Sequence, residues 1–282
     1  MTDVIAESPV AQAIADGVLP GRVWLYTNYH CNLACSYCLT ESSPRSERRQ
    51  LDPGVMLAVA EQAKDLGFTG LGITGGEPFL VPWLPETVLA MADHLPLVVL
   101  TNATQFAGDR IERAAVLAHP DIAVQISLDS HLPDVNDLAR GPENFAKVVD
   151  AVPRLIERGV RVRIATTTAA SLDDPQLTPL RELVAGLGVA AHDHLVRPIV
   201  RRGRADVLSI GVRPRAQDIP SELTITADGA YWGSFGPTVR AGRLDTDLLL
   251  TRTVLPLAVP ATALLGVLRG MPDGHDANLG IR

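Results

Sequence analysis

Apolar strand-like runs alternate with helix-like segments six times between residues 22 and 200 of this 282-residue chain. These runs are apolar throughout rather than at every second position, which is typical of strands that are covered on both faces. Repeated strand–helix units join parallel strands through right-handed crossovers. The sequence therefore predicts an α/β protein with a partial (β/α)6 barrel of the TIM type and a short C-terminal extension.

The bounds of the expected elements follow from apolar runs and from helix start signals. Strands are expected at residues 22–28, 70–74, 97–101, 122–128, 160–168 and 194–200. Helices are expected at residues 53–66, 84–94, 109–117, 144–158 and 179–187. Asn144 is expected to cap the helix that starts there, because its side chain can accept a hydrogen bond from a free helix N–H.

The chain is expected to divide into an N-terminal extension (1–21), a core (22–205) and a C-terminal segment (206–282). Beyond the core the sequence becomes rich in proline and glycine. A hairpin is expected at residues 223–232, with Asp228 and Gly229 in the turn. We expect this segment to cover one end of the barrel.

Composition excludes several classes of protein. Hydrophobic residues make up 46% of the chain, enough for a large core, and the net charge of −7 argues against a nucleic-acid partner. The sequence has no 18-residue apolar run and no secretory signal, so no membrane association is expected. Unpaired thiols belong in a reducing compartment, and the expected location is the cytoplasm.

All three cysteines of the chain lie within eight residues, as Cys31, Cys35 and Cys38. Their thiolates favour zinc, copper(I) or iron–sulfur clusters over hard metals. A structural zinc ion usually has four protein ligands, and the chain has no fourth cysteine. A four-iron cluster bound by three thiolates would keep one iron open to another ligand. Zinc binding and a redox thiol site remain as alternatives.

A second motif follows the second expected strand, Gly75-Gly76-Glu77-Pro78. Together with the C-x3-C-x2-C run after the first strand, it resembles the radical S-adenosylmethionine (radical SAM) superfamily over residues 23–205. The resemblance implies one 4Fe–4S cluster on the three cysteines, with SAM on its fourth iron. It also implies an external one-electron reductant, such as flavodoxin or ferredoxin, and a SAM-derived radical that removes hydrogen from a C–H bond.

The same resemblance implies contacts to SAM from residues near the first strands. Tyr37 would flank the adenine, while Gly75 and Gly76 would let the backbone approach the methionine end. Glu77 would lie near the SAM ammonium group.

Further expected contacts follow later strands. Thr101 and Asn102 end the third strand in a Thr-Asn-Ala-Thr version of a family motif, with Ala103 in place of the usual glycine. The loop is therefore expected to need only ordinary backbone angles. Ser127 and Asp129 would face SAM, or alternatively cap a turn. Arg197 would pair with the SAM carboxylate.

Other polar residues keep two interpretations. Thr166, Thr167 and Thr168 stand where many relatives have an asparagine that binds SAM, so that contact is in doubt. The arginines after the sixth strand, Arg201, Arg202 and Arg204, either line the site or are solvated. The residues after the fourth strand that resemble a family loop are either structural or touch substrate; they are His131, Asp134, Asn136 and Arg140.

The C-terminal segment resembles the hairpin that opens an auxiliary-cluster domain, but no cysteine follows it. We therefore expect a single cluster and no cysteine hydrogen donor. Tyr231 is the candidate donor by its place in the sequence. The preferred function is a radical SAM enzyme that acts on a small-molecule natural-product intermediate. The alternatives are a peptide-modifying radical SAM enzyme and a non-catalytic iron–sulfur scaffold or electron carrier.

Overall fold

A parallel six-stranded sheet forms the centre of the computed structural model, which describes residues 8–169, 174–215, 220–240 and 243–270. The six strands pair in chain order, each parallel to the next. They are β1 (Arg22–Tyr26), β2 (Gly70–Thr74), β3 (Leu97–Thr101), β4 (Ile122–Ser127), β5 (Arg161–Thr168) and β6 (His194–Pro198). Within the described residues β6 ends the sheet without closing back on β1, so the predicted partial barrel is an open one.

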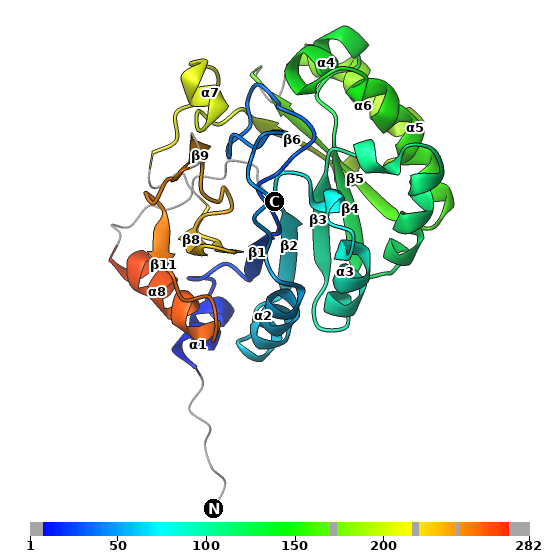
Figure 1. Ribbon diagram of the computed structural model, residues 1–282. Helices are drawn as coiled ribbons and strands as arrows, with labels where there is room; N and C mark the ends of the chain where they lie inside the picture. Colours follow the sequence, from blue (N-terminus) through cyan, green and yellow to red (C-terminus); the bar gives the residue numbers. More distant parts are fainter. Residues whose placement is uncertain (1–7, 170–173, 216–219, 241–242, 271–282) are drawn as a thin grey trace, which may run out of the picture.

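Helices follow the strands on the outer side of the sheet (Figure 1). They are α2 (Pro53–Asp65), α3 (Leu84–Ala92), the 3-10 helix η3 (Gly108–Leu117), α4 (Pro133–Arg140), α5 (Asn144–Glu157) and α6 (Thr178–Gly186). Five of these six match the expected helices in place, and α4 is additional. Short 3-10 turns lie at η1 (Pro78–Leu80), η2 (Thr104–Phe106), η4 (Pro175–Leu177) and η5 (Ala191–Asp193).

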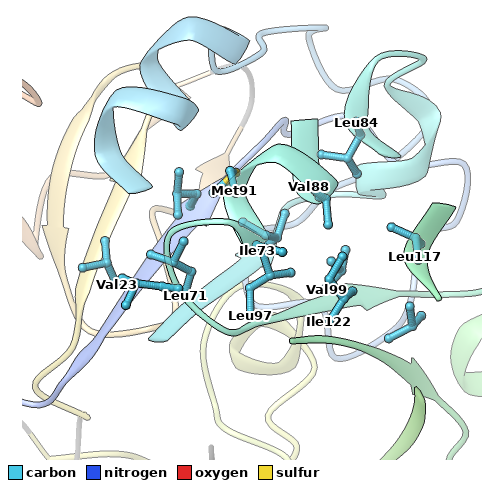
Figure 2. Close-up of a cluster of buried hydrophobic side chains, with 14 of the residues drawn as sticks. Val23, Leu71, Ile73, Leu84, Val88, Met91, Leu97, Val99, Leu117 and Ile122 are labelled. Atoms are coloured by element: carbon cyan, nitrogen blue, oxygen red, sulfur yellow. The ribbon is translucent and has the colours of Figure 1, made fainter. Parts of the chain in front are cut away.

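Alternate residues of each strand face opposite sides, as the pleat requires. The outward residues, such as Val23, Leu71, Ile73 and Val99, are buried against α2 and α3 in one large core (Figure 2). Leu84, Val88 and Met91 are buried on α3 within the same core. Burial of each such side chain contributes about 1.5–3 kcal/mol.

The inward-facing residues form two pockets, one at each end of the barrel, with a packed layer between them. Along β1, Tyr26 lines a pocket at the carboxyl end of the strands and Arg22 lines another at the amino end. Trp24 lies between them and packs with Val98 and Ala123 in a small buried cluster. A Cβ atom on Gly72 would clash with the Trp24 ring, so glycine makes room for this layer.

The C-terminal segment continues the sheet and also packs on the cysteine loop, where the Thr238 hydroxyl donates to the Leu39 carbonyl oxygen and the Val239 N–H to that of Thr40, both at 3.0 Å. β7 (Leu223–Thr226) pairs in parallel with β1, so it occupies the edge that β1 would otherwise expose. β8 (Gly229–Trp232) completes the expected hairpin, and β11 (Leu249–Thr251) pairs with β8. The strands β9 (Val239–Arg240) and β10 (Arg243–Leu244) form a separate pair.

The described residues form three further helices: α1 (Pro9–Ala15), α7 (Arg204–Val207) and α8 (Ala258–Arg269). In the described part of the chain, no helix is long and apolar enough to span a membrane.

The expected cap of α5 is wrong. Glu143, not Asn144, precedes the first helical residue, and Glu143 has a left-handed backbone with a φ of 61°. Asn144 is the first residue of the helix and is fully buried. Its side-chain amide donates a hydrogen bond of 3.0 Å to the Asn102 carbonyl oxygen, so it links α5 to the end of β3.

Candidate cofactor-binding site

The three cysteines line one pocket at the carboxyl ends of the parallel strands. The pocket has a volume of about 180 Å³. Its walls include ten residues that the sequence analysis predicts to bind the cluster or SAM: Cys31, Cys35, Tyr37, Cys38, Gly75, Gly76, Thr101, Asn102, Ser127 and Arg197. Residues from the carboxyl ends of all six core strands, β1 to β6, thus converge with the cysteine loop.

Cys31 is buried, whereas Cys35 and Cys38 are partly exposed. Cys31 is 7% exposed, and its sulfur accepts hydrogen bonds from the Leu33 N–H and, at 3.7 Å, from the Asn102 amide. The Cys35 thiol donates to the Arg140 carbonyl oxygen at 3.6 Å. Burial raises the pKa of both Cys31 and Cys35 above that of a free thiol. Both are therefore neutral thiols until a metal replaces the proton.

The backbone of the cysteine loop is held by the segment after β6. A Cβ atom on Gly203 would clash with the carbonyl oxygens of Cys38 and Leu39, and the φ of Gly203 is +58°. Only glycine fits this close approach without strain. Arg204 donates to the Ser42 carbonyl oxygen at 2.6 Å, while its backbone N–H donates to that of Cys38 at 3.1 Å. Arg204 therefore braces the loop.

The other two arginines of this segment point to different partners. Arg202 forms ion pairs with Asp245 and Asp247, at 3.2 and 2.7 Å. Arg201 donates to the Ser209 carbonyl oxygen at 2.6 Å. Neither lines the pocket within the described residues.

Glu77 is fully buried and faces β3 rather than the pocket. Its carboxylate accepts hydrogen bonds from the Thr101 hydroxyl, the Asn102 N–H and the Phe79 N–H, at 2.8, 2.8 and 3.0 Å. Burial raises its pKa to about 7, against the lowering effect of these three donors. In this arrangement the Glu77 carboxylate positions Asn102, whose side-chain amide contacts the Cys31 sulfur.

The two glycines before Glu77 have a packing role of their own. A Cβ atom on Gly76 would clash with the His30 carbonyl, and one on Gly75 would lie 2.5 Å from Asn28 Oδ1. Both also line the pocket. The glycines therefore let the chain entering the cysteine loop pack directly on the end of β2.

Ala103 corrects one expectation. Its backbone is left-handed, with φ 62° and ψ −1°, although the missing glycine suggested ordinary angles. A left-handed conformation costs a residue with a Cβ atom about 1–2 kcal/mol. Its methyl group is fully buried in the core, which offsets part of that cost.

Asp129 belongs to a buried network behind the pocket wall. Its Oδ2 accepts from the Tyr37 hydroxyl and, at 3.1 Å, from the Arg140 guanidinium, which also contacts the Tyr37 hydroxyl. Its Oδ1 accepts from the Thr167 N–H at 2.9 Å. Burial acts to lower the pKa of Arg140, but Tyr37 and Asp129 raise it above its usual value. Asp129 therefore orients Tyr37 and Arg140, and only the latter two line the pocket.

Arg140 is a residue whose place the sequence left undecided. It lines the pocket and is 6% exposed, and its Nε atom has no hydrogen-bond partner among the described residues. Arg197 lines the same pocket and donates to the Thr167 hydroxyl at 3.2 Å. Burial lowers the pKa of Arg197. Arg140 and Arg197 carry two positive charges, and Asp129, which pairs with Arg140, carries one negative charge. This wall of the pocket therefore has a net positive charge.

The threonines at the end of β5 have different roles. Thr166 is buried and bonds the Leu128 carbonyl oxygen and His194 Nε2, at 2.7 and 2.9 Å. Thr167 lines the pocket. Of these two threonines, Thr167 is therefore the one that faces the pocket.

Tyr231 does not lie at this site. It is fully buried in β8, it does not line the pocket, and its hydroxyl has no hydrogen-bond partner among the described residues. Two strands, β7 and β1, separate β8 from β2 in the sheet. The structure thus gives no support to Tyr231 as a hydrogen donor.

The donor set fits an iron–sulfur cluster better than a single ion. In the described part of the chain, no three His, Cys, Asp or Glu side chains converge closely enough to hold one metal ion. Three soft thiol donors nonetheless share one pocket with no acidic ligand beside them. Such donors suit a cluster, which is wider than an ion.

Comparison with known proteins identifies the family. A family model described as the radical SAM superfamily matches residues 25–172, more than half of the chain. The chain belongs to the radical SAM superfamily. It is therefore an enzyme of a class that uses SAM and an iron–sulfur cluster.

Curated radical SAM relatives match the core. The chain is 34% identical over 158 residues to the mycofactocin maturase MftC of Mycobacterium ulcerans, which covers 52% of this chain and 40% of the relative. It is 27% identical over 164 residues to the sporulation killing factor maturation protein SkfB of Bacillus subtilis, covering 56% and 38%. The chain thus spans about two fifths of the length of these relatives.

A third relative is matched over more of its own length. The 7-carboxy-7-deazaguanine synthase of Methanothermobacter thermautotrophicus is 25% identical over 202 residues, covering 63% of this chain and 82% of the relative.

Solved radical SAM structures share the fold. Streptococcus suis SuiB bound to SAM superposes with a TM-score of 0.56 at 20% identity, covering 67% of this chain and 43% of SuiB. The anSMEcpe enzyme with bound SAM and a Cp18Cys peptide gives a TM-score of 0.61 at 12% identity, covering 89% and 84%. At these identities the likeness establishes the fold alone.

Proposed function

We propose that this radical SAM enzyme modifies a peptide, using one 4Fe–4S cluster held by Cys31, Cys35 and Cys38. The observation that carries the cofactor assignment is the convergence of all three thiols with the Arg140 and Arg197 guanidinium groups in one pocket. When bound, the cluster and SAM supply a carbon-centred radical that can remove hydrogen from an unactivated C–H bond.

The cysteine loop prepares the metal ligands. Since burial keeps Cys31 and Cys35 protonated in the metal-free protein, the thiols release protons as they bind iron. The Asn102 amide then donates toward the Cys31 sulfur, and hydrogen bonds to a ligating sulfur tune the potential of a cluster. Arg204 fixes the loop so that three thiols stay on one side of the pocket.

The cationic wall binds SAM. Arg197 and Arg140 offer guanidinium forks, whose geometry suits a carboxylate. Tyr37 is oriented by Asp129, and its ring lies in the pocket wall where an adenine can pack. Ser127 and Thr167 add hydroxyl groups to this wall.

Two relatives support the proposed substrate class. MftC and SkfB are named as maturation enzymes, and both match this chain over more than half of its length. They support a peptide substrate over the small-molecule intermediate expected from the sequence. The match to most of a deazaguanine synthase supports a small-molecule substrate as the second candidate.

The proposal includes an external one-electron reductant, such as flavodoxin or ferredoxin, because all three cysteines belong to one loop. It also places the enzyme in the reducing cytoplasm, where unpaired thiols persist.

The test uses anaerobically reconstituted enzyme with SAM and a strong reductant. It compares a synthetic peptide, taken from a short reading frame next to the gene where one is found, with a pterin- or purine-type small molecule. Peptide-dependent release of 5′-deoxyadenosine with a change in peptide mass supports the proposal. Release that depends only on the small molecule supports the second candidate. Full cluster loading without any release of 5′-deoxyadenosine supports the alternative of a non-catalytic iron–sulfur scaffold or electron carrier.

A further inference from the structure

A second pocket lies inside the barrel at the amino ends of the strands, opposite the cysteines. Its volume is about 190 Å³, and its walls come from the beginnings of β1 to β5. The Trp24, Val98 and Ala123 layer lies between Arg22, at this end, and Tyr26, at the other. This pocket therefore takes no part in the cofactor site.

Three arginines line this lower pocket: Arg22 at the start of β1, and Arg161 and Arg163 at the start of β5. Arg161 and Arg163 are two residues apart on a strand, so their side chains leave the same face. Asp121 is the acidic residue that lines the pocket with them. The described lining therefore carries an excess of positive charge.

Two carboxylates orient these arginines without lining the pocket. Asp193 Oδ1 lies 2.9 Å from Arg161 Nη2 and 3.5 Å from Arg163 Nε, so one oxygen is shared by two cations. Glu222 lies 3.8 Å from Arg22 Nη1, and it accepts a shorter bond of 2.7 Å from the Trp24 indole. Arg22 also lies over the Trp24 ring, and among the described residues these contacts use only some of the N–H donors of the three guanidinium groups.

The Nε atom of Arg163 is only loosely partnered. The side chain is 18% exposed, and its buried Nε atom has the 3.5 Å ion-pair contact with Asp193 but no hydrogen bond to any described residue. Burial lowers the pKa of Arg163 while the nearby Asp193 acts to raise it, and the charges of Arg161 and Arg22, which line the same pocket, add to the lowering. An anion between them would relieve both the missing bond and the mutual repulsion.

We propose that the lower pocket binds a phosphate group, either free phosphate or a small phosphate ester. A carboxylate is satisfied by a single guanidinium fork, whereas three arginines from two strands can surround the several oxygens of a phosphate. Because the ligand would join β1 to β5 across the open barrel, binding stabilises the folded protein by mass action.

The experiment measures binding of inorganic phosphate and of phenyl phosphate to the reconstituted enzyme by calorimetry, at fixed ionic strength. A thermal-unfolding series in the same ligands runs beside it, with malonate as the carboxylate probe. We expect saturable phosphate binding and a rise in melting temperature, and weaker binding of malonate. The phenyl ester distinguishes the source: tighter binding than free phosphate indicates an ester as the natural ligand.

Three variants test the site. Arg163→Gln and Arg22→Gln should each weaken phosphate binding by about tenfold, since each removes a charged donor. Arg213→Gln makes the same charge change on an exposed residue outside both pockets and should leave binding unchanged. Arg22→Gln keeps the test informative if Arg163→Gln does not fold. Absence of phosphate binding by the folded wild type, or equal binding by all variants, overturns the proposal. SAM cleavage is not part of this readout, so the result is independent of the proposed function.

Discussion

The Arg204 guanidinium donates a hydrogen bond of 2.7 Å from Nε to the backbone carbonyl oxygen of Cys35. This contact joins two segments that are 169 residues apart in the chain. With the bonds from the same residue to Ser42 and Cys38, it fixes the loop at three points. The geometry of the thiols therefore depends on the segment that follows the last core strand.

Arg204→Gln should loosen the cysteine loop without unfolding the barrel. Each charge-assisted hydrogen bond is worth about 1.5–3 kcal/mol, and a glutamine cannot replace both guanidinium bonds. We expect lower iron content after reconstitution and faster loss of iron to a chelator, measured by absorbance. Arg201→Gln is the matched control because Arg201 bonds Ser209 and not the loop. Equal iron retention in both variants would contradict the bracing role.

Glu77 predicts a pH dependence of the metal-free protein. Burial raises its pKa from 4.5 to about 7, so the folded state holds the proton more tightly than the unfolded chain. Its stabilising contribution is full below pH 4.5, is lost as the pH rises toward 7, and is absent above. A shift of this size corresponds to about 3 kcal/mol. Urea unfolding from pH 4.5 to 8 measures it.

The comparison with Glu77→Gln isolates this effect, since other groups titrate equally in both proteins. The variant lacks the titrating carboxylate, so its stability should vary less over this range. Its amide also opposes the Asn102 N–H, which should lower its stability at acidic pH by about 1 kcal/mol. Parallel pH profiles for wild type and variant would refute the assignment. Glu61→Gln, on the exposed side of α2, serves as the control.

Arg197→Gln should weaken SAM binding while leaving the fold intact. The guanidinium makes one side-chain bond within the described residues, to Thr167, so little structure depends on it. Loss of a charged donor to a carboxylate predicts about tenfold weaker binding. Anaerobic calorimetry of the reconstituted protein measures the dissociation constant. An unchanged constant would remove Arg197 from the SAM site.

Tyr231→Phe should not change SAM cleavage. The hydroxyl lies outside the cofactor pocket and has no partner among the described residues, so its removal breaks no hydrogen bond there. The rate of 5′-deoxyadenosine release should match that of the wild type. A fall of about tenfold or more would restore Tyr231 as a proton or hydrogen donor.

The core strands and most helices could be predicted because their apolar periodicity is strong. α4 could not, since its pattern is inverted. Its buried residues are the polar Asn136 and Arg140, whereas Val135 and Leu138 are 53% and 88% exposed. Periodicity methods take apolar residues as the buried face. The segment was therefore predicted to be a loop. In the structure, Asn136 and Arg140 on its polar face form hydrogen bonds with Asp129.

The cysteine pocket could be predicted because its residues follow strand ends in a known order. The sequence did not allow us to predict which of these side chains face the pocket. Glu77 and Asp129 end in the expected places, but each is occupied by protein donors. The pairing of β7 with β1 could not be predicted either. It joins residues about 200 positions apart, and local sequence patterns carry no information about contacts at that separation.

The iron and sulfide content of anaerobically reconstituted protein shows whether the three cysteines hold one 4Fe–4S cluster. We expect about four irons and four sulfides per chain in the wild type, and loss of the cluster absorbance in Cys35→Ala. More than about five irons per chain, stoichiometric zinc in place of iron, or full cluster absorbance in Cys35→Ala would contradict it.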